Sequence, residues 1–366
     1  MLSLFDFSAS AVFVMSFSSS LYFLRTPSPV TASILLTPDA TPDSLKILNF
    51  SVEQIAEDFD LPIRKLSIDY HEKREKGHIL TKQEIDYIRN DVEIMSRALD
   101  FMFQNDMKKM TISSNAFNNF KEMQPKFKQL FPVLSKGYDD DIRKSYKGGF
   151  TYLNPKYKEK QVEQGIVFDV NSEYPAMMRY KLLPFGMPMT FTGEYKPDKL
   201  YPLYIVSFTC RFELKAGKIP SIQIKHSMDY QENEYLESSN GLITELTLTS
   251  VDYELFRENY NVYDLHFIGG YKFMAKHGIF DKYIDYWTEQ KIKAKKEHNS
   301  SMTRLAKLML NSCYGRFGIS TRSIMKKPFQ SKQDGIVKFA PYKGKKQKSV
   351  YTALASFVTS YGRDYI

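Results

Sequence analysis

The sequence predicts an α+β fold, because strand-like and helix-like patterns are both clear and lie in different stretches of the chain. Gly165–Phe168 is a short apolar run followed directly by Asp169, which is typical of a strand buried in a sheet. The stretches 85–102 and 303–314 repeat apolar residues with a helical period. With 366 residues and 43% hydrophobic content, the chain can build two or three domains with real cores.

The first predicted helix begins at Thr81. Thr81 and Glu84 have the spacing of a capping box, in which each side chain binds the backbone N–H of the other residue. Tyr87 and Asp91 lie one turn apart on this helix and therefore share a face. This pair is also common on ordinary helices, so it distinguishes no function by itself. The expected apolar face comprises Ile85, Ile88, Val92, Met95, Leu99 and Met102.

Tyr146-Lys147-Gly148-Gly149 is the next distinctive segment. Two glycines let the backbone approach a phosphate closely, and a lysine and aromatic residues stand beside them. The segment is therefore a candidate contact with nucleic acid, and a plain turn between domains is the alternative.

Asp169 is a candidate metal ligand at the end of the apolar run. A buried strand would hold the carboxylate in place, and the carbonyl oxygen of Val170 could face the same divalent cation. An aspartate after an apolar strand is more often a structural or turn residue, so the motif needs support from elsewhere. Tyr174 lies five residues further on and could lie under a nucleotide sugar, where its ring would exclude a 2′-hydroxyl.

The second predicted helix carries ammonium, amide and phenol groups in a row. Lys307 can bind triphosphate oxygens, and Asn311 and Tyr314 can contact the base pair being formed. Gly315 is expected to end the helix. One face comprises Thr303, Lys307, Asn311 and Tyr314, and the other comprises Leu305, Leu308 and Ser312.

In this order and spacing, the two motifs resemble Asp-x-x-Ser-Leu-Tyr-Pro and Lys-x-x-x-Asn-Ser-x-Tyr-Gly of the protein-primed family B DNA polymerases of small tailed phages. The resemblance runs from about Ser44 to Ile366, and Glu173 replaces the usual leucine. It implies addition of deoxynucleotides to a primer 3′ end, or to a hydroxyl on a priming protein, by two-metal phosphoryl transfer with Mg²⁺ or Mn²⁺. DNA primer-template, deoxynucleoside triphosphates and a terminal priming protein are the implied partners.

The resemblance also implies roles for individual residues. Asp169 and Val170 would bind metal in the polymerase site, and Asp91 would bind metal in a 3′-5′ exonuclease, where Tyr87 orients the attacking water. Thr303 stands where a nucleotide-binding lysine is expected, and neighbouring Arg304 points off the shared face. The expected nucleotide contacts are Tyr174, Lys291, Lys307, Asn311 and Tyr314, and the expected DNA contacts are Ser44, Leu45, Phe50, Lys65, Tyr70, Tyr146, Gly148, Gly149 and Ser172.

The implied architecture is a remnant of an RNase H-like exonuclease domain followed by an incomplete polymerase palm with two inserted subdomains. The first insertion would grip the priming protein and DNA, and the second would clamp the strands. The expected segments are an unrelated, disordered leader (1–43), the C-terminal part of the exonuclease (44–145), the first part of the palm (146–221), the first insertion (222–278), the nucleotide-binding helices (279–318), the second insertion (319–349) and the start of a returning palm helix (350–366).

Two family motifs are not found in this sequence. The Tyr-x-Asp-Thr-Asp hairpin should supply the second metal-binding carboxylate of the palm, and an Asp-x-Glu motif should precede residue 44. We therefore expect a chain truncated at both ends, with little or no activity on its own. Three hypotheses stay open: a polymerase whose missing hairpin another chain supplies, a non-catalytic DNA-binding module, and a degraded relic.

Composition favours a polyanionic partner. The net charge is +9 and the isoelectric point is about 9.1, with lysines clustered near Tyr342 and Tyr351. Two cysteines and six histidines show no spacing typical of a disulfide framework or a metal site. The apolar, serine-rich leader lacks a basic segment before it, so we expect no membrane segment and a cytoplasmic protein, in the host cell if a phage encodes it. A targeting peptide is the alternative.

Overall fold

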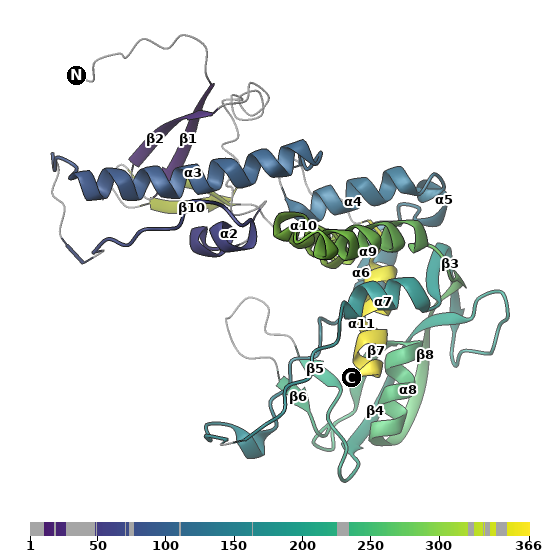
Figure 1. Ribbon diagram of the computed structural model, residues 1–366. Helices are drawn as coiled ribbons and strands as arrows, with labels where there is room; N and C mark the ends of the chain where they lie inside the picture. Colours follow the sequence, from purple (N-terminus) through teal and green to yellow (C-terminus); the bar gives the residue numbers. More distant parts are fainter. Residues whose placement is uncertain are drawn as a thin grey trace. The chain divides into compact units, whose positions relative to one another are not determined.

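The computed structural model describes residues 11–17, 20–26, 48, 50–69, 71–72, 77–109, 111–162, 164–224, 234–320, 326–331, 333, 337–341 and 350–366. The chain divides into two compact units. Unit 1 comprises Met1–Asn119 and Asp285–Ser312, and unit 2 comprises Phe120–Ile284 and Cys313–Ile366. Figure 1 shows their helices and strands.

Unit 1 is mainly helical. It contains α2 (Val52–Asp58), α3 (Lys82–Gln104), the first part of α4 (Ile112–Met123), most of α9 (Asp281–Lys296) and α10 (Ser300–Ser312). The predicted capping box is confirmed, since Thr81 and Glu84 bind each other's backbone N–H at 3.2 and 2.8 Å. The predicted apolar face is largely buried from Val92 to Met102, but Ile85 is exposed.

Polar side chains on α10 and α9 bind residues on or beside other helices of unit 1. The Arg304 guanidinium lies 3.9 Å from the centre of the Phe50 ring, and its Nε lies 3.1 Å from Asp58 Oδ2. Trp287 Nε1 on α9 donates to Asn119 Oδ1 on α4 at 2.9 Å. These contacts hold α10 to α2, and α9 to α4, through paired polar groups.

Two segments of the leader expected at residues 1–43 form strands, and the rest of it lies outside the described residues. β1 (Ala11–Phe17) and β2 (Ser20–Thr26) pair as antiparallel strands, with Ala11 opposite Thr26. Both strands are rich in apolar and aromatic residues, which favour extended backbone, and cross-strand hydrogen bonds pair them locally.

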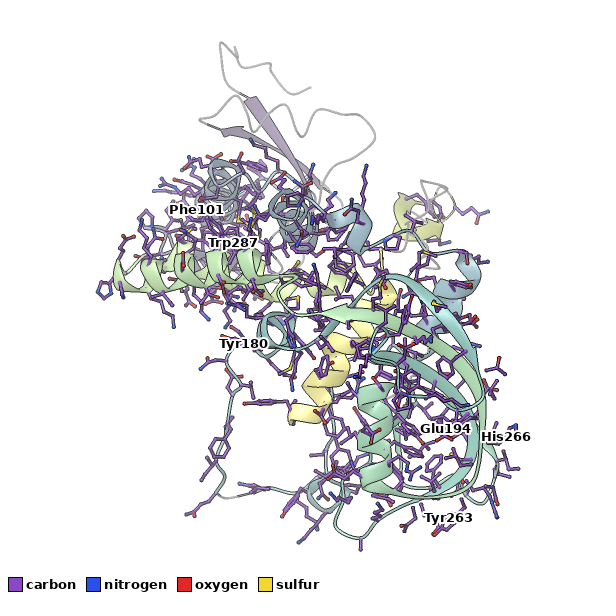
Figure 2. The ribbon with its side chains drawn as sticks, turned by 90° about the vertical axis from the view of Figure 1, so that its right-hand side faces the viewer. Phe101, Tyr180, Glu194, Tyr263, His266 and Trp287 are labelled. Carbon is purple, nitrogen blue, oxygen red and sulfur yellow. The ribbon has the colours of Figure 1, made fainter. Side chains whose placement is uncertain are left out.

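Unit 2 is built on one antiparallel sheet with the strand order β3-β8-β4-β7. The strands are β3 (Leu183–Thr192), β4 (Leu203–Leu214), β7 (Thr244–Thr249) and β8 (Tyr260–Lys276). The helix α8 (Ser250–Asn259) covers one face, and Figure 2 shows His266 of β8 pointing away from it. The buried cluster between sheet and helix comprises Val206, Phe208, Cys210, Phe212, Ile222, Leu248, Tyr253, Phe256 and Tyr260.

The sheet crosses the segment boundary expected at residues 221 and 222. β3 and β4 precede this boundary, while β7 and β8 follow it and pair with them. Gly270 marks the closest approach of two strands, because a Cβ there would collide with the Ile205 carbonyl oxygen. Antiparallel pairing thus makes one packed layer from what sequence comparison divides into two segments.

Shorter elements complete unit 2. The helices are α5 (Phe127–Leu130), α6 (Lys136–Lys144), α7 (Glu173–Tyr180) and α11 (Thr352–Tyr365), with 3₁₀ turns at Pro155–Tyr157 and Tyr314–Arg316. Two small antiparallel pairs are β5 (Ile222–Ile224) with β6 (Glu234–Leu236), and β9 (Lys326–Gln330) with β10 (Val337–Pro341). No helix in the described part of the chain has the length and apolar character needed to cross a bilayer.

The central helix of unit 2 is α11, which is buried from Thr352 to Arg363 and contacts α6, α7, α8 and β3. Near its C-terminal end, Arg363 binds both carboxylate oxygens of Asp252 on α8, at 2.9 and 2.7 Å. Ser360 Oγ donates to the same carboxylate at 2.6 Å. A buried ion pair is tolerated when such hydrogen bonds complete it, so α8 and α11 are held in register.

Two local expectations are wrong. Gly165–Phe168 forms no strand, and Val167 and Phe168 are 95% and 87% exposed. An apolar run becomes a buried strand only where neighbouring strands bind its backbone, and no described strand pairs with this segment. In addition, α10 ends at Ser312, so Gly315 lies inside the following 3₁₀ turn instead of ending the helix.

We predict that Arg363→Met destabilises the protein by about 3–5 kcal/mol, because it leaves the Asp252 carboxylate buried without its partner. Urea unfolding followed by circular dichroism would measure the loss. Arg211→Met is the matched control, since Arg211 forms an exposed ion pair with Asp264, and such pairs contribute about 0–1 kcal/mol. Equal losses in both variants would contradict the importance assigned to the buried pair.

Candidate functional site

Unit 2 brings together Tyr174 of α7 and Tyr314, which follows α10. Their ring centroids are 4.5 Å apart with an interplanar angle of 38°, and their hydroxyls share a hydrogen bond. Burial, followed by the charge of Glu173, raises the pKa of Tyr174. Both phenols therefore stay neutral at physiological pH, and the pair forms a half-buried aromatic surface.

The Tyr146–Gly149 loop packs against this tyrosine pair. A Cβ on Gly149 would lie 2.5 Å from the Tyr174 hydroxyl, and a Cβ on Gly318 would lie 2.6 Å from the Tyr146 hydroxyl. A Cβ at position 149 would therefore force the Tyr174 ring or the loop to shift.

The backbone of the same loop is fastened to α11. Thr359 Oγ1 donates to the Lys147 carbonyl at 2.9 Å, and Arg363 Nη1 donates to the Gly148 carbonyl at 2.6 Å. Burial, followed by the Arg363 charge, lowers the pKa of Lys147, although Asp252 opposes this shift. The position of the loop therefore depends on hydrogen bonds from α11, which lies more than 200 residues away in sequence.

Glu173, at the start of α7, packs against α11. Its carboxylate lies against α11 at Gly362, where any Cβ would collide with Oε1. Burial raises the pKa of this carboxyl group. The Glu173 side chain fits against α11 because Gly362 has no Cβ.

The structure does not assemble a metal site around Asp169. Asp169 is exposed in an irregular segment, Val170 is 40% exposed, and Ser172 adopts a left-handed conformation with φ of 55° before α7. Within the described residues, no group of three or more His, Cys, Asp or Glu side chains could hold a metal ion. One carboxylate and one carbonyl are an incomplete donor set for Mg²⁺, which prefers six oxygen ligands.

In unit 1, Asp91 and Tyr87 lie together on α3. The Tyr87 hydroxyl donates to the Asp91 carboxylate, and Lys65 Nζ lies 4.0 Å from Asp91 Oδ2 and 5.9 Å from the Tyr87 ring. Burial raises the pKa of Asp91, although Tyr87 and Lys65 oppose the shift. Asp91 Oδ1 is buried and accepts no hydrogen bond from the described residues, so the carboxylate is only partly satisfied.

Other predicted DNA contacts have different surroundings. The Phe50 ring is covered by the Arg304 guanidinium and is therefore not an open surface. Lys65 joins the Asp91 pair. Ser44, Leu45 and Tyr70 lie outside the described residues.

The predicted nucleotide-binding cations of unit 1 lie on α9 and α10. Lys307 and Asn311 are exposed on one face of α10, while Leu305, Ala306, Met309 and Leu310 form its buried face. Lys291 on α9 is half-buried, and its pKa is lowered by burial and then by the charges of Lys295 and Lys307. Of the four residues predicted to share a face, Lys307 and Asn311 are exposed, while Thr303 and Tyr314 are half-buried and Tyr314 lies beyond the end of α10. Leu308 and Ser312, predicted on the other face, are half-buried.

Sequence reasoning missed Arg363 and Asp252. They are 111 residues apart, and neither belongs to a recognisable motif. The only local signal was a basic residue in the last turn of a predicted helix, which is common because it suits the helix dipole.

Comparison with known proteins identifies a family and individual relatives of this chain. A family model described as DNA polymerase type B, organellar and viral, matches residues 39–366. The DNA polymerase of Bacillus phage Nf is 45% identical over 323 residues, covering 88% of this chain and 56% of the relative. That of Streptococcus phage Cp-1 is 32% identical over 335 residues, covering 88% and 58%.

Solved structures of a relative are also similar. Phi29 DNA polymerase in an orthorhombic crystal form has a TM-score of 0.81 at 44% identity, covering 88% of this chain and 56% of that chain. Phi29 DNA polymerase complexed with primer-template DNA and incoming nucleotide substrates has a TM-score of 0.76 at 44% identity, covering 87% and 56%. The chain thus spans little more than half the length of the curated relatives it matches.

We predict that Gly149→Ala destabilises unit 2 by about 1–3 kcal/mol, because the added methyl group overlaps the Tyr174 hydroxyl and the packing must shift. Urea unfolding monitored by tyrosine fluorescence would measure the effect. Gly148→Ala is the control, since a Cβ there meets nothing within 4 Å. If both alanines are tolerated equally, Gly149 does not hold Tyr174 in place.

We predict that Asp91→Asn stabilises unit 1 at neutral pH in the absence of divalent cations. The folded pKa of Asp91 lies above its ordinary value near 3.8, so its ionisation costs stability as pH rises from 3.8 through the folded pKa. Asparagine removes this cost, and the stability difference from wild type should shrink below pH 3.8. Thermal unfolding across this pH range would measure it, with Asp86→Asn as the exposed control on the same helix. A constant difference would contradict the burial of the Asp91 charge.

Proposed function

The chain belongs to the protein-primed family B DNA polymerases, and from this membership we propose that it provides part of a DNA-directed DNA polymerase that adds deoxynucleotides to a primer 3′ end. The observation that carries the proposal is the tyrosine pair, Tyr174 and Tyr314, packed against the Tyr146–Gly149 loop. A rigid aromatic surface beside a DNA-contacting loop suits a site that positions a nucleotide.

Tyr174 is the proposed selector for deoxyribose. Its ring is fixed on one side by Tyr314 and by Gly149, so it cannot move aside for a 2′-hydroxyl. Tyr314 would pack against the Tyr174 ring and hold it in place. Selection by exclusion requires such a fixed side chain, because a mobile one would admit both sugars.

Lys291, Lys307 and Asn311 are the proposed nucleotide contacts of unit 1. Lysine ammonium groups bind phosphate oxygens by charge-assisted hydrogen bonds. The described residues offer Lys291 and Lys307 no ion-pair partner, which leaves both able to bind an anion. Asn311 is exposed beside Lys307, where its amide can contact a base.

Asp169 and the Val170 carbonyl are the proposed ligands of a divalent cation in the palm, and Asp91 is the proposed ligand in the exonuclease part, with Tyr87 orienting water. Bound Mg²⁺ or Mn²⁺ would activate the primer hydroxyl and stabilise the leaving pyrophosphate. The buried, unsatisfied Asp91 oxygen supports the second assignment. The exposed position of Asp169 means that further oxygen ligands must complete the first site.

The finer architecture belongs to the same proposal. Residues 44–145 would be the C-terminal part of an RNase H-like exonuclease domain, and the palm would begin at the Tyr146–Gly149 loop. The insertions at 222–278 and 319–349 would contact a priming protein and DNA. The similarity to solved structures of Phi29 DNA polymerase complexed with primer-template DNA and incoming nucleotide substrates supports DNA and nucleotides as partners. The host cytoplasm is the proposed location.

A DNA-binding role without catalysis is the second candidate. The 366 residues contain no Tyr-x-Asp-Thr-Asp motif, and the run before Asp169 is exposed. The net charge of +9 would still support binding to DNA phosphates. We therefore propose that this polypeptide alone binds DNA but does not extend a primer.

We predict that the purified 366-residue chain, with Mg²⁺ or Mn²⁺ and deoxynucleotides, extends a labelled primer no faster than its Asp169→Ala variant. The reason is that one carboxylate cannot hold the two cations that phosphoryl transfer needs. Gel analysis of primer length would measure incorporation. Incorporation that disappears in Asp169→Ala would contradict the prediction and would mean that another carboxylate completes the site.

The DNA-binding part of the proposal has its own measurement. Affinity for primer-template DNA should fall with salt, with a slope of several units in a plot of log K against log salt concentration. Fluorescence anisotropy with a labelled duplex would give the slope. Absence of binding at low salt would reject both the polymerase and the DNA-binding proposals for this polypeptide.

A further inference from the structure

Three lysine side chains of unit 1 form a cluster with no opposite charge among the described residues. Lys291 and Lys295 lie one turn apart on α9, so their side chains leave the helix on the same side, about 40° apart around its axis. Lys307 is exposed on α10, and its positive charge, like that of Lys295, lowers the pKa of Lys291. Ion pairs between described residues involve none of the three.

Lys293, Lys296 and Arg304 of these helices have different surroundings. Lys293 and Lys296 lie on the opposite side of α9, about 140–160° from Lys291. There they share a shallow groove with Glu289, Ile292 and Glu297. On α10, Arg304 is held by Asp58 and Phe50.

The Thr303 hydroxyl on α10 also has a hydrogen-bond partner. Thr303 Oγ1 donates to the Asn299 carbonyl at 2.8 Å within its own helix. It therefore adds no free donor to the face that carries Lys307 and Asn311. Lys291, Lys295 and Lys307 are therefore the cations of these helices that lie away from Glu289 and Glu297 and that electrostatics link to one another.

We propose that Lys295 is a third phosphate-binding residue of the nucleotide site, acting with Lys291 and Lys307 on the triphosphate. The inference rests on the proposed function, because it takes the ligand to be a nucleoside triphosphate. One helical turn, about 5.4 Å, separates Lys291 from Lys295 along α9, so the two ammonium groups can reach different phosphate groups of one chain. Lys295 is exposed, so its long side chain is free to turn towards the ligand.

The electrostatics of Lys291 agree with this geometry. Burial and the positive charges of Lys295 and Lys307 make the charged form of Lys291 less favourable. A bound triphosphate would replace this repulsion with attraction to all three groups. Binding should therefore raise the pKa of Lys291, and removal of the Lys295 charge should raise it in the free protein as well.

The test uses the full chain and inorganic tripolyphosphate as the probe, measured by isothermal titration calorimetry at low salt. Lys295→Gln should weaken binding by about tenfold, the usual loss for a charge-assisted hydrogen bond. Lys293→Gln is the matched control, since it removes the same charge from the far side of α9 and should change affinity little. Lys295→Arg should restore most of the affinity.

The outcomes separate this inference from the proposed function. If Lys291→Gln and Lys307→Gln weaken binding but Lys295→Gln resembles Lys293→Gln, the role of Lys295 is rejected and the nucleotide site remains. If Lys293→Gln weakens binding as much as Lys295→Gln, the cluster is only a general basic surface and the inference fails. If neither Lys291→Gln nor Lys307→Gln has an effect, the proposed nucleotide site itself is wrong, and the inference falls with it.

A second readout excludes a merely structural effect. The pKa of Lys291, followed by NMR of labelled lysine side chains, should rise in Lys295→Gln without ligand and stay unchanged in Lys293→Gln. A change in folding would instead alter many lysine signals in both variants. An unchanged Lys291 pKa in Lys295→Gln would show that the two ammonium groups do not interact, which would reject the cluster.

Discussion

The buried ion pair between Arg363 and Asp252 is the interaction on which the organisation of unit 2 depends. Arg363 binds both oxygens of the carboxylate, and its remaining donors reach Ser360 and the Gly148 carbonyl. One guanidinium therefore joins α11, α8 and the Tyr146–Gly149 loop. Burying two charges is unfavourable unless every donor and acceptor is satisfied, so the pair specifies a single arrangement of these three elements.

Hydrogen bonds from another arginine hold the N-terminal end of α11. Arg143 on α6 donates to Asp139, to Thr352 at the start of α11 and to the Gly318 carbonyl, with distances of 2.7–3.1 Å. With both ends fixed, α11 presents Gly362 to Glu173 and Tyr174 on α7. The aromatic surface formed by Tyr174 and Tyr314 is thus set by polar contacts behind it, while the segment that carries Asp169 has no such support and is exposed.

Unit 1 contains charged groups that lower its free energy of unfolding. The Asp91 carboxylate is buried with one oxygen unsatisfied, and Lys291 is half-buried beside two further ammonium groups. Each raises the free energy of the folded state relative to a neutral side chain, as binding sites commonly do. A cation at Asp91 and a polyanion at the lysine cluster would offset these costs, so ligand binding and the stability of unit 1 are expected to be linked.

The sequence by itself determined the α+β class, the capping box of α3 and the family, because these rest on local periodicity and on motifs read along the chain. It did not determine that Gly165–Phe168 is exposed, that β3, β4, β7 and β8 share one sheet, or that Arg363 meets Asp252. Strand burial depends on hydrogen bonds to partner strands, and the ion pair joins residues 111 positions apart. Contacts of that kind carry no local signal, so only the tertiary structure decided them.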